Sequence, residues 1–143
     1  MGILTRLFGP RRDPARELEK LRARLESFMR PSMALVDSRQ LTIPAQRERF
    51  ALYVYGAATV LAESRGLGET EALALVVMFL RGSSRMTEQE VSHLVGRAMA
   101  LAQEPDSAAV HDAGAEAMAQ WLAGDAGSGV TRLADTLKKT ATD

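Results

Sequence analysis

The chain contains no cysteine and only two histidines among its 143 residues. The absence of cysteine excludes disulfide bonds, thiolate metal sites and cysteine nucleophiles, and it suits the reducing cytoplasm. No group of residues has the spacing of a recognisable catalytic or metal-binding motif. We therefore expect a cytoplasmic protein that is not an enzyme and that holds no metal and no cofactor.

Long apolar runs are also missing. The longest, Ala72–Leu80, is about half of the roughly 20 residues that a membrane-crossing helix needs. Met1–Phe8 is too short for the apolar core of a signal peptide, and Arg6 interrupts it. With 46% hydrophobic and 25% charged residues, the composition is that of an ordinary globular domain.

Helix start and stop signals organise the whole chain, and no segment alternates between apolar and polar residues over the length of a strand. The sequence therefore predicts an all-α, compact single-domain bundle of five to six helices over residues 13–143, preceded by a separate basic segment, residues 1–12. The expected helices cover about 14–29, 44–65, 69–81, 87–102 and 107–123, and a last one begins near 130. Pro31 is expected to end the first of them.

Two of these helices, 44–65 and 69–81, have centres that are apolar almost all round, which is typical of buried helices. We expect both to be central in the bundle. A domain of this size has room for about one wholly enclosed helix, so either could instead form the interface of a homodimer. Gly56, Gly96 and Gly114 lie inside expected helices and suggest that helices cross there at close range.

Glu90-x-x-His93 has the spacing of the half-sites found in di-iron bundles. The other histidine, His111, has Ala108 three residues before it, so the second half-site is missing. Glu90 is better explained as the acid of a capping box that begins at Thr87.

His111 and Asp112 are the other acid and base candidates. Adjacent helical residues do not face each other, so this pair is not a catalytic dyad by itself. We expect His111 to be a partly buried structural residue.

The sharpest positive feature is the N-terminal segment. Its apolar residues fall on one face of a short helix, with basic residues beside them, which suits a membrane interface or a docking peptide. The alternative is that the segment packs on its own domain or is disordered. The candidate docking residues are Ile3, Leu4, Leu7, Phe8, Arg11 and Arg12.

Positive charge continues into the first long helix, where Arg16, Lys20 and Arg24 share a face. Residues 1–30 contain eight Arg or Lys against four Asp or Glu, although the whole chain is neutral. Interleaved glutamates favour a solvated helix with ion pairs four residues apart, and nucleic-acid binding is not expected.

The stretch Val60–Leu101 has two apolar helices joined by a short loop and then a capped helix. This arrangement resembles small bacterial helical domains of the tellurite-resistance TerB type. The acidic residues that mark the metal loop of that family do not appear in the expected form, and Gly66-Leu67-Gly68-Glu69 is the nearest stretch. Many helical domains share this architecture, so we assign no family.

The function we expect is therefore that of a non-catalytic protein-binding module, such as an immunity or antitoxin-like protein, an adaptor or a chaperone. A toxin or an effector would suit it as the partner protein. The alternative is a peripheral membrane-associated regulatory protein that makes a weak membrane contact through residues 3–12. An enzyme whose carboxylates are brought together only by the fold ranks third.

Overall fold

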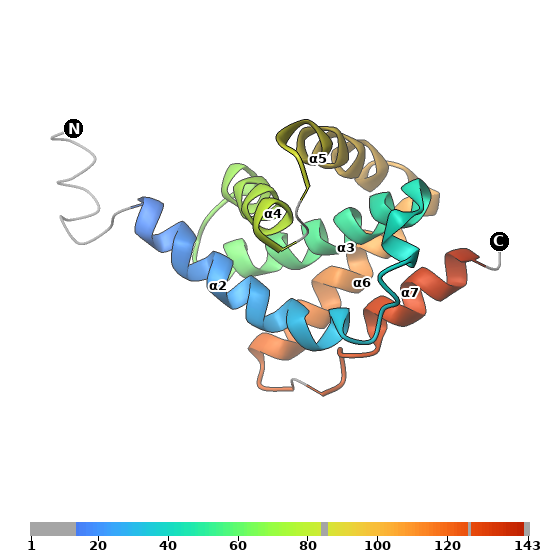
Figure 1. Cartoon of the computed structure of the whole chain (residues 1–143). Helices are drawn as coiled ribbons and strands as arrows, with labels where there is room; N and C mark the ends of the chain where they lie inside the picture. The colour runs from blue at the N-terminus through green and yellow to red at the C-terminus, as the bar shows by residue number, and fades with distance from the viewer. Residues whose placement is uncertain (1–13, 84–85, 126, 142–143) are drawn as a thin grey trace, which may run out of the picture.

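The computed structural model describes residues 14–83, 86–125 and 127–141, and within these ranges it is all-α, with no strand (Figure 1). The all-α prediction is confirmed, whereas the segment 1–12 lies outside the described residues. The elements are α2 (Pro14–Met33), the short 3-10 helix η1 (Gln40–Thr42), α3 (Pro44–Glu63), α4 (Glu69–Ser83), α5 (Glu88–Ala102), α6 (Pro105–Leu122) and α7 (Arg132–Ala141). Among the described helices, none is both long enough and apolar enough to cross a bilayer.

Helix α3 lies at the centre and contacts each of the other helices of the described chain (Figure 1). Every residue from Phe50 to Ala58 is buried, so the helix is enclosed on all sides over two and a half turns. A large side chain such as Phe50, 1% exposed, contributes about 2 kcal/mol by leaving water. The all-round apolarity of this segment in the sequence therefore reflects its burial.

Helices α3 and α6 cross with their backbones in contact. A Cβ atom added to Gly56 would stand 1.9 Å from the carbonyl oxygen of His111. One added to Gly114 would stand 2.0 Å from the carbonyl oxygen of Tyr53. Only glycine permits this approach, so the close crossing expected from the helical glycines is confirmed at these two positions. At Gly96 it is wrong, because a Cβ there would meet nothing within 4 Å.

Helix α4 packs against α3 and lies between α2 and α5. Leu75, Val76 and Leu80 of α4 are fully buried, with no exposed surface. Leu73 and Val77 on its other side stay partly exposed. The α3 helix is thus the wholly enclosed one, and α4 forms one wall of the bundle.

One proline does not act where the sequence predicted, and another opens its helix slightly earlier than expected. Pro31 was expected to end the first helix, but α2 continues to Met33 with Pro31 inside its last turn. The reason is packing, because Ser32 is buried and Met33 packs against the core. Pro105 opens α6 two residues before the expected start at about 107, in the first turn, where a missing backbone N–H costs nothing.

The end of α3 follows the prediction. Gly66 has a positive φ of 71°, a conformation that glycine adopts without strain. The amides of Gly66 and Leu67 then donate to the carbonyls of Glu63 and Ala62, each at 3.0 Å. These bonds turn the chain sharply toward α4.

Candidate functional site

The docking residues predicted in the N-terminal segment (Ile3, Leu4, Leu7, Phe8, Arg11 and Arg12) lie outside the described residues. Their role stays a prediction. The positions of the other candidate groups are given by the structure.

Glu90 is fully engaged in a structural role. Its Oε1 accepts from the backbone N–H of Thr87 at 3.1 Å, and Thr87 Oγ1 accepts from the N–H of Glu90 at 3.2 Å. Its Oε2 accepts from Arg47 of α3 at 2.8 Å. The Arg47 guanidinium, helped by the Thr87 bonds, lowers the pKa of Glu90 to about 2. The capping box is confirmed; His93 is exposed to solvent.

His111 lies in a cleft of about 360 Å³ between the ends of several helices. Its ring packs edge-on against Tyr55 of α3, with the centroids 5.1 Å apart. The Tyr55 hydroxyl donates to Glu69 at the start of α4 over 2.7 Å. The fold therefore brings together an imidazole, a phenol and a carboxylate from three helices.

Within this trio Tyr55 and Glu69 are hydrogen-bonded, whereas His111 contacts Tyr55 through ring packing. Burial and the Glu69 carboxylate raise the pKa of Tyr55 to about 12, so the phenol stays protonated and acts as a donor. The side chain of His111 is 22% exposed and approaches Asp112 at 3.5 Å between Nδ1 and Oδ1. The partly buried position expected for His111 is confirmed, with Tyr55 as its packing partner.

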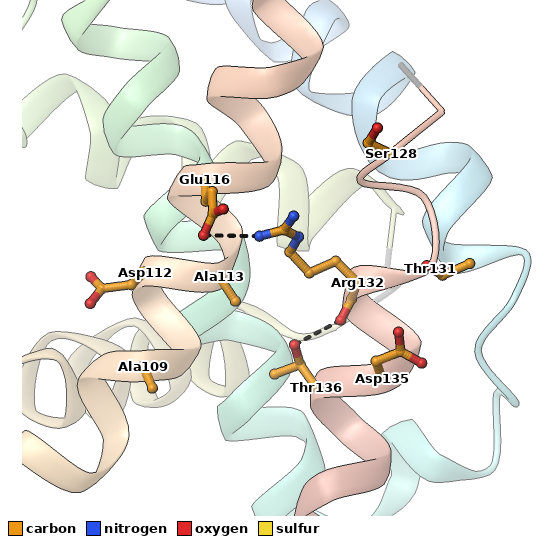
Figure 2. A pocket seen from close by; sticks show the side chains of 9 residues that line it. All are labelled: Ala109, Asp112, Ala113, Glu116, Ser128, Thr131, Arg132, Asp135 and Thr136. Carbon is orange, nitrogen blue, oxygen red and sulfur yellow. Dashed lines mark hydrogen bonds and ion pairs between the residues drawn. The ribbon is translucent and has the colours of Figure 1, made fainter. Parts of the chain in front are cut away.

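A second, more open groove of about 490 Å³ separates α6 from α7 (Figure 2). Arg132 of α7 reaches across it and pairs with Glu116 of α6 at 3.0 Å. The same guanidinium donates to Gln120 at 3.0 Å. Asp112 and Asp135 line the groove with exposed side chains. Arg132 thus bridges two helices, and the groove is polar and accessible to solvent.

The described part of the chain contains no candidate metal site. No three side chains among its His, Asp and Glu residues come close enough together to hold an ion. The acidic residues and the histidine that line the cleft and the groove are therefore distributed along the helices and not gathered at one point.

The solvent faces of the helices differ in charge. Beyond its first turn, where Glu88 and Glu90 are exposed, the exposed face of α5 carries no Asp, Glu, Lys or Arg. The uncharged residues of this face are Gln89, Ser92, His93, Gly96, Met99 and Ala100, followed by Gln103 at the C-cap. By contrast, α6 has three acidic residues and no basic one. On α2 the exposed face is basic.

The exposed side of α5 does not stand out in the sequence. Met99, an apolar residue, is 41% exposed, whereas Val91, Leu94 and Ala98 form the buried side. Which side of the helix faces solvent depends on its packing against the rest of the bundle.

Fold and surface together define a small helical bundle with chemically distinct faces. No protein-family model, curated protein or solved structure matches the chain. The interpretation of its function therefore depends on the arrangement of its own residues.

Proposed function

We propose that this chain is a non-catalytic protein-binding module and that the outer face of α5 recognises its partner. The observation that carries the proposal is the absence of charge on this face. A quarter of the chain is charged, yet beyond the first turn, where Glu88 and Glu90 are exposed, the exposed residues of α5 and its C-cap include no Asp, Glu, Lys or Arg.

Two charged residues beside the α5 face, Arg97 and Glu90, are held by the neighbouring helix. Arg97 pairs with Glu48 of α3 at 3.3 Å. At the start of α5, Arg47 of α3 pairs with Glu90 at 2.8 Å. These ion pairs fix α5 against α3 and turn the charges away from the exposed face.

The chemistry of the face suits contact with another protein. The centres of protein interfaces are depleted of charge and enriched in methionine, and the flexible thioether adapts to different shapes. Met99 stands beside Gly96, whose missing side chain leaves the helix surface flat and open. A helix or a strand of a partner can approach the backbone closely at this point.

A toxin, an effector or a client protein are the partner classes that fit the proposal. An immunity or antitoxin-like protein covers such a partner, an adaptor links it to another protein, and a chaperone holds it. The α5 face supplies the contact in each of these roles.

Site-specific photo-crosslinking tests this proposal. A benzophenone amino acid at Ser92 of α5 should give one discrete cross-linked protein in the native cell, and the same group at Ala109 on the exposed face of α6 should not. Cross-linking from Ala109 alone would contradict the choice of face. A product containing two copies of this chain would assign the face to a homodimer and contradict a foreign partner.

A second candidate function, docking of residues 3–12 on a membrane, is favoured by one observation. The helix that follows this segment exposes a row of basic side chains with no acidic residue in the row.

A further inference from the structure

Helix α2 exposes a straight row of residues that we call the basic ridge: Arg16, Lys20, Ala23, Ser27 and Arg30. All five are exposed. Their spacing of four and three residues places them on one face, opposite the buried residues Leu21, Leu25 and Met29. From Arg16 to Arg30 the ridge extends about 21 Å along the helix.

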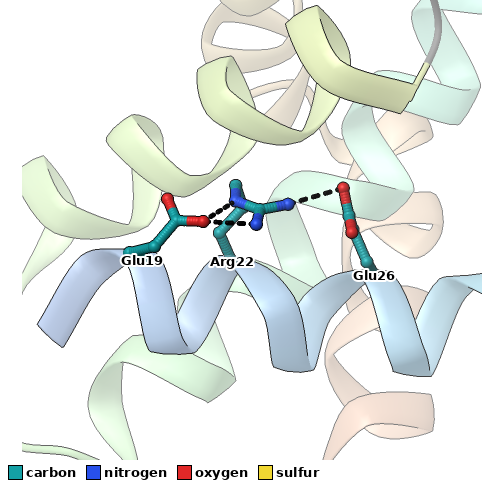
Figure 3. Close-up of polar contacts among 3 residues, drawn as sticks. All are labelled: Glu19, Arg22 and Glu26. Atoms are coloured by element: carbon teal, nitrogen blue, oxygen red, sulfur yellow. Dashed lines mark hydrogen bonds and ion pairs between the residues drawn. The ribbon is translucent and has the colours of Figure 1, made fainter. Parts of the chain in front are cut away.

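Two of the three glutamates of α2 are paired away from this ridge, and Glu17 forms no ion pair among the described residues. Glu19 and Glu26 both pair with Arg22 on one flank of the helix (Figure 3). Arg22 Nε donates to Glu19 at 2.8 Å, and another nitrogen of the same guanidinium lies 2.7 Å from Glu26. Two of the interleaved acids of the sequence, Glu19 and Glu26, are therefore directed to a residue outside the ridge.

The ridge cations have no counterpart among the described residues. No ion pair within these ranges involves Arg16, Lys20 or Arg30. Arg24, which the sequence placed on the same face, instead lies over the Trp121 ring at 5.4 Å. The positive charge of the ridge is thus available to an anion outside the chain.

We propose that the basic ridge docks on an anionic lipid surface. Ala23 and Ser27 are small and lie between the basic residues, so the whole length of the helix can approach a plane. Stable attachment to a bilayer takes two weak signals, one electrostatic and one apolar. The basic ridge supplies the electrostatic signal; the apolar residues Ile3, Leu4, Leu7 and Phe8, which the sequence predicts as docking residues, precede α2 in the segment outside the described residues.

The charge on the flanks of the ridge favours a membrane over a nucleic acid. Glu17 lies on one side of the ridge, and Glu19 on the other. A duplex in contact with α2 would bring its phosphates toward these carboxylates, because its curved backbone passes along both sides of a helix. A flat bilayer touches the ridge and leaves both flanks in water. This inference extends the second candidate function and does not depend on the α5 face.

Vesicle co-sedimentation of the full chain tests the ridge. The probe is a phosphatidylcholine vesicle with or without 30 mol% phosphatidylserine, at low and at high salt. Each basic residue near an anionic leaflet strengthens binding by roughly fivefold. The triple variant Arg16→Glu, Lys20→Glu, Arg30→Glu should therefore lose about 100-fold in affinity or more, and salt should weaken binding of the wild-type chain.

The matched control reverses three other exposed basic residues, Arg39→Glu, Arg65→Glu and Arg81→Glu, which gives the same net charge. It should bind as the wild type does. Circular dichroism of both triple variants checks the fold, and the glutamine version of the ridge variant should show a smaller loss. Equal losses in the two triple variants, absence of wild-type binding to anionic vesicles, or tighter binding to duplex DNA in the same buffer would each overturn the proposal.

Discussion

The backbone of Gly114 in α6 lies against the carbonyl of Tyr53 in α3, so closely that a Cβ on the glycine would stand 2.0 Å from that oxygen. The Cβ would also lie 2.9 Å from the carbonyl carbon. Both neighbours are main-chain atoms of the central helix, and they cannot move without displacing α3. This contact sets how closely the two helices pack.

Replacing Gly114 by alanine should therefore destabilise the fold, although alanine is the better helix former. The loss should be at least the 1–3 kcal/mol or so that is typical of an overpacked core. Gly96→Ala is the matched control, because space is open there, and it should raise stability by up to about 1 kcal/mol. Urea unfolding measures both changes. A neutral Gly114→Ala variant would show that the helices are not in backbone contact.

Tyr53 is fully buried, and its hydroxyl has no hydrogen-bond partner among the described residues. Tyr53→Phe should stabilise the protein by about 1 kcal/mol, because it removes a polar group that lost its water on burial. Chemical denaturation at pH 7 measures this change. Destabilisation by Tyr53→Phe would mean that the hydroxyl has a partner in solution.

Tyr53→Phe should also change how stability decreases at alkaline pH. Burial raises the pKa of Tyr53 to about 12 from its ordinary value of 10. The folded state therefore holds the phenolic proton up to a higher pH than the unfolded chain does. The resulting contribution to the free energy of unfolding is complete below pH 10 and is lost as pH rises toward 12. Melting temperatures at pH 9 and pH 11 should fall less steeply in Tyr53→Phe than in the wild type.

Acid should weaken the junction of α3 and α5. The pKa of Glu90 is lowered from 4.5 to about 2, chiefly by Arg47, so its contribution is present above pH 4.5 and is lost as pH falls toward 2. Glu90→Gln should lower the melting temperature at pH 7 and have little effect near pH 2. Exposed Glu88→Gln in the same turn is the control. An equal effect of Glu90→Gln at both pH values would contradict the role of its charge.

Leu75 of α4 has no exposed surface. Leu75→Asp should unfold the domain, because burying an unpaired charge costs several kcal/mol. Thr70→Asp, at an exposed position in the first turn of the same helix, should leave it folded. Circular dichroism with thermal melting distinguishes the two. An unchanged melting temperature in Leu75→Asp would contradict the placement of α4.

The features that the sequence predicted well are those with local causes. The Thr87–Glu90 capping box begins a helix at the expected residue, because both of its hydrogen bonds form within one turn. Helix α3 could be located from its apolar surface, since a helix enclosed on all sides leaves no polar face. Pro31 was misread because burial of Ser32 and Met33 outweighs the local preference to end the helix.

The cleft around Tyr55, Glu69 and His111 could not be predicted in the same way. Each residue belongs to a different helix, and their meeting depends on how closely α3 and α6 pack. The ion pairing on α2 could not be predicted from the sequence either. Interleaved Glu and Arg residues looked self-neutralising, and the choice of Arg22 as the common partner of Glu19 and Glu26 depends on side-chain geometry.

Partner binding by two matched Ala→Glu variants tests the central claim most directly. Ala100 lies on the uncharged face of α5 and Ala119 on the exposed face of α6, each within the last turn of its helix. Calorimetry uses the partner protein that photo-crosslinking at Ser92 identifies. It should show at least a tenfold loss of affinity for Ala100→Glu and wild-type affinity for Ala119→Glu. Wild-type affinity in Ala100→Glu would contradict recognition through α5.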